Sequence, residues 1–105
     1  NLRLHTAEND QILCFSKSTP ALDNIIFVVT TVDPWNGQSA FVHVPLEEFG
    51  IRADEDYAME DLLTGEVFHW RGSRNFVALD PHHRPAHVFR VRRKIGRDAG
   101  RDLFA

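Results

Sequence analysis

Residues 61–70 (DLLTGEVFHW), 75–81 (NFVALDP) and 85–91 (PAHVFRV) decide the fold. Within these short runs apolar side chains alternate with polar ones, and glycine, serine, aspartate and proline separate one run from the next. Successive antiparallel strands joined by tight turns have this pattern, because neighbouring residues of a strand point to opposite faces of a sheet. The stretch therefore predicts three antiparallel strands.

The same criteria applied to the rest of the chain predict five further strands. They cover residues 2–5, 11–16, 25–32, 39–44 and 57–63. Residues 25–32 (IIFVVTTV) are β-branched and apolar on both faces, so they are expected to form a central strand that is covered on both sides. Residues 33–37 (DPWNG) predict a hairpin loop, and residues 46–50 (LEEFG) predict one helical turn that ends at glycine.

Seven or eight short strands in 105 residues predict an all-β fold. The expected architecture is an antiparallel β-sandwich, with Greek-key connections as one option. Residues 1–92 are expected to form one domain, and residues 93–105, where basic residues, glycines and aspartates replace the apolar pattern, a flexible basic tail. Because a strand is expected almost directly after Asn1, we interpret the sequence as a segment of a larger chain.

Charge and cysteine content exclude several classes of protein. The formal net charge of −3 gives no broad attraction for a phosphate backbone, so no nucleic acid partner is expected. The longest apolar run, residues 25–29, is far shorter than the about 20 residues of a membrane span. Cys14 is the only cysteine, which rules out an internal disulfide and favours a reducing, cytoplasmic location. Its apolar neighbours indicate a small buried side chain without chemistry.

Paired carboxylates are the minimal machinery of a glycosidase, and three groups of adjacent acids in this sequence could supply such a pair. They are Glu47-Glu48, Asp54-Glu55-Asp56 and Glu60-Asp61. Adjacent acids in turns are usually solvated, so we assign no catalytic residue. The sequence has no glycine-rich phosphate loop, nucleophile elbow or HExxH motif, and no cofactor is expected.

Histidine spacing raises the question of a metal site at His82, His83 and His87. Adjacent histidines in a proline-rich loop usually face water, and His87 falls on an alternating strand position where an imidazole fills a half-buried layer. We therefore assign no metal ligand.

Arg90 and Arg92 share one face of the last predicted strand. They are either solvated or in contact with phosphate or with an acidic neighbouring domain.

The two tryptophans are the better leads for a ligand. Trp35, beside Pro34 and Asn36, is expected to be exposed, where its indole can stack on a sugar ring or contact another protein. Trp70 ends a strand next to Phe68 and is expected to pack in the core. Trp35 is thus the candidate substrate-binding residue.

Several short motifs, in their order and spacing, carry a family resemblance. They are residues 9–13 (NDQIL), 15–17 (FSK), 32–34 (VDP), 61–65 (DLLTG), 75–81 (NFVALDP) and 85–87 (PAH). Together they resemble the C-terminal domain of the bacterial α-1,4-glucan:maltose-1-phosphate maltosyltransferases, of the α-amylase superfamily (glycoside hydrolase family 13). The resemblance covers residues 2–91, and it departs from the family at Trp35-Asn36, where relatives often have histidines.

The resemblance implies a non-catalytic β-sandwich that follows a catalytic (β/α)8 barrel. That barrel holds the reactive carboxylates of such enzymes, so none is expected here. The implied role is to stabilise and position the barrel of an enzyme that extends α-1,4-glucan from maltose 1-phosphate. Two alternatives stay open, a carbohydrate-binding module that contacts α-glucan through Trp35, and a protein-interaction domain that uses Leu103-Phe104 and the basic tail.

Overall fold

The computed structural model describes residues 2–93, so the expected tail lies outside the described residues apart from Arg93. Eight strands and one helical turn follow one another along this part of the chain. They are β1 (Leu2–His5), β2 (Ile12–Ser18), β3 (Ile25–Thr31), β4 (Gln38–His43), α1 (Leu46–Phe49), β5 (Asp56–Asp61), β6 (Val67–Arg71), β7 (Arg74–Leu79) and β8 (Ala86–Arg93). The predicted strands are confirmed, with ends that differ by a few residues.

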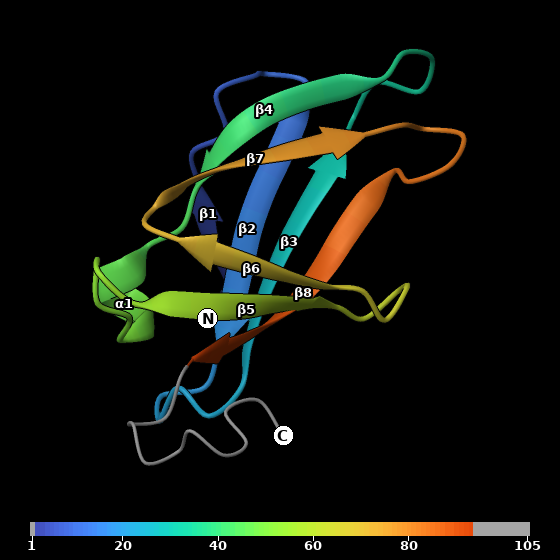
Figure 1. Cartoon of the computed structure of the whole chain (residues 1–105). Coiled ribbons are helices and arrows are strands. Elements are labelled where there is room, and N and C mark those ends of the chain that lie inside the picture. Colours follow the sequence, from blue (N-terminus) through green and yellow to red (C-terminus); the bar gives the residue numbers. More distant parts are fainter. Residues whose placement is uncertain (1, 94–105) are drawn as a thin grey trace.

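The strands form two antiparallel sheets that face each other (Figure 1). The larger sheet has six strands in the order β1-β2-β3-β8-β5-β6, and the smaller sheet pairs β4 with β7. At one side, the segment after β1 closes the sandwich, because Ala7 forms a bridge with Val42 of β4. The predicted all-β sandwich is confirmed.

The loop at residues 33–37 does not connect the two strands of a hairpin, contrary to the sequence-based prediction, because β4 pairs with β7 and not with β3. β3 already pairs with β2 on one side and β8 on the other, so no edge of it is free for β4. The loop therefore carries the chain from the large sheet to the small one (Figure 1). Turn residues predict that a chain reverses direction but not which sheet the next strand joins.

The core lies between the sheets and follows the period-two pattern of the strands. In the large sheet Phe27 of β3 lies opposite Phe89 of β8, and both side chains are almost completely buried. The small sheet contributes Val42 and Val77, which face them from the other layer. The inward face of β8 is the predicted one, formed by His87, Phe89 and Val91.

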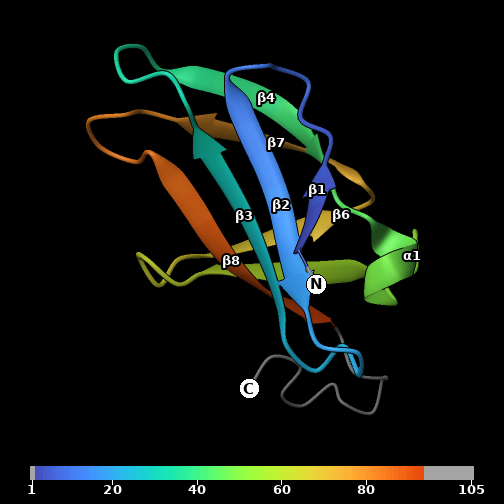
Figure 2. The same ribbon diagram turned by 180° about the vertical axis from the view of Figure 1, so that it is seen from behind.

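Only one face of β3 is covered, contrary to the expectation of a doubly covered strand. Ile25, Phe27 and Val29 point into the core, whereas Ile26 and Val28 point outward and stay partly exposed. Figure 2 shows β3 from this outer side, between β2 and β8, with no labelled element in front of it. The apolar outer face of β3 is therefore unexplained by the packing of residues 2–93.

The predicted helical turn is confirmed as α1. Gly50 follows it with a φ of 72°, in the left-handed region that favours glycine, and its backbone N–H donates to the carbonyl of Glu47. Within residues 2–93, no helix has the length and apolar character needed to cross a membrane.

Tyr57 ties β5 to the turn between β6 and β7. Its side chain is buried, and its hydroxyl donates to the carbonyl of Gly72 at 2.6 Å and accepts from Nδ2 of Asn75 at 3.1 Å. Burial raises the pKa of Tyr57 to about 12.

We expect Tyr57→Phe to lower the free energy of unfolding by about 1–2 kcal/mol, because Gly72 and Asn75 each lose a partly buried hydrogen bond to the Tyr57 hydroxyl. Urea denaturation followed by tryptophan fluorescence measures the change. An unaltered midpoint would mean that water replaces the hydroxyl.

Candidate functional site

Trp35 projects from an ordered turn between β3 and β4. It is 75% exposed, which confirms the expected exposure. The carboxylate of Asp33 holds the turn, since it accepts from the backbone N–H of Trp35 at 2.8 Å, from the backbone N–H of Asn36 at 3.1 Å and from Nε2 of Gln38 at 2.7 Å. The hydrogen bonds from Trp35 and then Gln38 lower the pKa of the Asp33 carboxyl. Because these hydrogen bonds fix the backbone of the turn, the exposed indole can stack on a flat apolar surface without ordering the loop.

Trp70 packs in the core, as predicted. It is 9% exposed and meets Tyr57 and Phe89 in edge-to-face contacts, with ring centroids 6.4 and 5.3 Å apart. This tryptophan stabilises the sandwich.

Four of the seven acids in the three groups named for glycoside chemistry have an arginine partner. Glu48, Asp54, Asp56 and Glu60 form ion pairs with Arg3, Arg52, Arg71 and Arg92 respectively. Glu55 accepts from the backbone N–H of Arg52. The hydrogen bond from Arg52 lowers the pKa of the Asp54 carboxyl, which disfavours the protonated form that a general acid needs. These contacts are structural.

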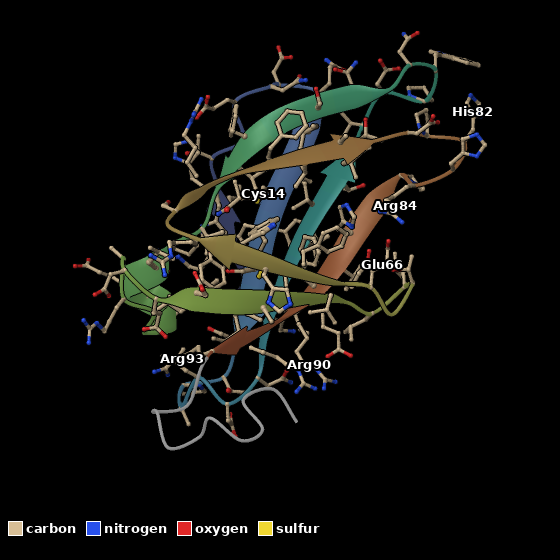
Figure 3. All side chains as sticks on the ribbon, viewed as in Figure 1. Cys14, Glu66, His82, Arg84, Arg90 and Arg93 are labelled. Atoms are coloured by element: carbon tan, nitrogen blue, oxygen red, sulfur yellow. The ribbon has the colours of Figure 1, made fainter. Side chains whose placement is uncertain are left out.

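The three histidines considered for a metal site occupy different environments. His82 and His83 are exposed in the loop between β7 and β8, and Figure 3 shows His82 near the tip of that loop. His87 is buried, and its Nδ1 lies 2.7 Å from Oδ2 of Asp61. Among residues 2–93, no group of three histidine, cysteine or acidic side chains is placed to hold a metal ion.

The Asp61–His87 pair is the buried polar contact that the sequence analysis missed. Asp61 is fully buried, and its Oδ1 also accepts from the backbone N–H of Leu63 at 2.9 Å. The pair thus joins the end of β5, the following turn and β8. A signal was present, because Asp61 continues the period-two series of Tyr57 and Met59 that points into the core.

A recess of about 200 Å³ opens beside His87, between the edges of β6 and β7. Its walls are mainly aromatic, formed by Phe68, Trp70, Phe76 and Phe89. Arg84 also lines the recess and forms an ion pair with Glu66. Both side chains are labelled in Figure 3. We interpret the recess as the open side of the sandwich, where the two sheets diverge.

Glu8 anchors a small ion cluster over the β4–β7 sheet. Its carboxylate accepts from Nε and Nη2 of Arg74 at 2.8 and 3.0 Å, and its Oε2 lies 2.6 Å from Nε2 of His43. The hydrogen bond from Arg74, followed by that from His43, lowers the pKa of Glu8 to about 2. The guanidinium of Arg74 also stacks on Phe41, 3.7 Å from the ring centroid.

Since folding lowers the pKa of Glu8, its ionised form contributes stability above the ordinary pKa of 4.5, and this contribution is lost as the pH falls toward about 2. We expect Glu8→Gln to be less stable than the wild type at pH 7 and equally stable near pH 2. Urea midpoints between pH 2 and pH 7 measure this. A difference that is constant with pH would assign the effect to packing.

Cys14 lies in the core, 1% exposed, and burial raises the pKa of its thiol to about 12. We expect a thiol reagent at pH 8 to label it at least about 100-fold more slowly in the native chain than in urea, because only the exposed thiolate reacts. Rapid native labelling would show that β2 opens frequently.

Comparisons with known proteins confirm the family resemblance. The family model described as "GLGE, C-terminal" matches residues 4–91. The chain is 44% identical over 84 residues to an alpha-1,4-glucan:maltose-1-phosphate maltosyltransferase of Chlorobaculum tepidum, covering 80% of this chain and 12% of that protein. It is 37% identical over 93 residues to the alpha-1,4-glucan:maltose-1-phosphate maltosyltransferase 2 of Streptomyces coelicolor, and the match covers 89% of this chain and 14% of that protein.

A third relative, the maltosyltransferase of Burkholderia pseudomallei, is 38% identical over 112 residues, which covers 99% of this chain and 10% of that protein. The chain therefore spans only 10–14% of the length of these curated relatives.

Proposed function

The chain belongs to the GLGE C-terminal family, and from this membership we propose that it is the non-catalytic C-terminal β-domain of a longer, cytoplasmic glucan-processing enzyme. Its role there is to stabilise and position a catalytic (β/α)8 barrel of the same polypeptide. The proposed parent is a maltosyltransferase that extends α-1,4-glucan from maltose 1-phosphate.

The observation that carries the proposal is the small fraction of each relative's length that the chain matches. Proteins named as maltosyltransferases match it over most of its length, yet 86–90% of each of the three relatives described above lies outside the match. The ion pairs of the candidate acids support a structural role. A sandwich that covers the flank of a barrel excludes water from the helices it contacts and restrains their loops.

Removing residues 1–105 from the parent polypeptide tests the proposal. We expect a lower melting temperature and a lower transferase rate, because the flank of the barrel becomes exposed. A truncated enzyme with the melting temperature and rate of the full-length enzyme would contradict the proposal.

The exposure of Trp35 on an ordered turn favours a second candidate function, retention of α-glucan. Electrophoresis of the chain in gels that contain glycogen separates the two functions. Free migration of the wild type supports the structural role. Retardation that is lost in Trp35→Ala and kept in Phe76→Ala, an exposed aromatic on the small sheet, supports glucan binding.

A further inference from the structure

The outer face of the first three strands of the large sheet is apolar. Its side chains come from alternate positions that point away from the core, as the pairing of Leu4 with Phe15 shows. We call this the outer apolar face, formed by Leu2, Leu4, Leu13, Phe15, Ile26 and Val28. Leu2 is 63% exposed, Leu4 70% and Leu13 42%.

A solvated sheet face normally carries polar side chains, and part of this sheet does so. On the same side, β8 carries Val88 opposite Val28 and then Arg90 and Arg92, while Glu60 of β5 forms an ion pair with Arg92. The change from apolar to charged side chains therefore occurs within one sheet, along β8 beyond Val88. This boundary is typical of a surface that is covered on one part only.

The outer apolar face is also hollowed. A recess of about 330 Å³ lies on it, with Leu2, Phe15, Ile26 and Val28 as its apolar walls. The polar rim comes from Lys17 and from the loop between β2 and β3. An apolar side chain of a partner fits such a recess, while the rim stays in contact with water.

We propose that the outer apolar face docks against the preceding part of the same polypeptide, on an apolar helix face of the proposed catalytic barrel. This inference rests on the proposed function and names the surface through which it acts. The description of the matching family as C-terminal favours a parent chain that lies mainly on the N-terminal side of these residues.

The path of the chain favours this occupant over a second copy. A preceding segment joins β1, which is the edge strand of the large sheet and itself supplies Leu2 and Leu4 to the face. The chain therefore arrives at the border of the outer apolar face. A segment of the same polypeptide is present at a high effective concentration near this face, whereas a second copy of the chain is not.

Thiol labelling of the full-length parent tests the proposal. In this domain Leu4 is 70% exposed and Phe76, on the outer face of the small sheet, is 56% exposed, so without docking Leu4→Cys labels at least as fast as Phe76→Cys. If the face is docked, we expect N-ethylmaleimide to label Leu4→Cys at least about tenfold more slowly than Phe76→Cys. Mass spectrometry measures the two labelling rates. Leu2→Cys is a second probe of the same face.

Equal or faster labelling at Leu4→Cys and Leu2→Cys would overturn the proposal. Protection that disappears on dilution would instead identify a second copy as the occupant. Protection that disappears when residues 94–105 are deleted would identify that segment, and either result overturns the inference. If truncation of residues 1–105 still destabilises the parent, the proposed function survives and another face makes the contact.

Discussion

Replacing Asp61 by alanine is expected to lower the free energy of unfolding by about 3–5 kcal/mol. The change leaves His87, which is 4% exposed, without its partner at Nδ1. It also removes the acceptor of the Leu63 backbone N–H, so the turn between β5 and β6 loses one of its hydrogen bonds. The loss is large because a buried polar group without a partner keeps its full desolvation cost.

Urea denaturation of the 105-residue chain measures this effect, and two variants control it. Asp61→Asn is expected to lose less, because the amide keeps one acceptor oxygen. Glu66→Ala removes the exposed ion pair with Arg84 and is expected to cost less than about 1 kcal/mol. If Asp61→Ala cost no more than Glu66→Ala, the buried pair would have no structural role.

Phe89→Ala is expected to cost about 3–5 kcal/mol, because the side chain is the centre of an aromatic cluster. It is 1% exposed, stacks on His87 with ring centroids 4.7 Å apart, and meets Phe68 and Trp70 in edge-to-face contacts. Alanine leaves a cavity that the paired strands on both sides of β8 cannot close.

Phe76→Ala is the matched control for Phe89→Ala. Phe76 is 56% exposed and contacts Phe41 at a centroid distance of 5.3 Å, so its removal is expected to cost less than about 1 kcal/mol. Similar urea midpoints for the two variants would contradict the assigned core.

The local structure could be predicted from the sequence because its signals are local. Alternation of apolar residues marks the strands, and Gly50 marks the end of α1. The exposure of Trp35 and the burial of Trp70 followed from their neighbours in sequence.

The arrangement of strands could not be predicted in the same way. Residues 33–37 have turn chemistry, yet whether β4 pairs with β3 depends on β8, which follows more than 40 residues later. The Asp61–His87 contact likewise joins residues 26 positions apart. The pattern of β3 also predicts apolar side chains on both faces, but nothing within residues 2–93 covers the outer one.

Thermal inactivation of the proposed parent transferase tests the central claim, that the β-domain supports the rest of the enzyme through its fold. Compared with the wild type, the Phe89→Ala enzyme is expected to have the same rate at low temperature and to lose activity at least about tenfold faster at a fixed elevated temperature. The Phe76→Ala enzyme should match the wild type. A Phe89→Ala enzyme with an unfolded β-domain and an unchanged inactivation half-life would contradict the claim.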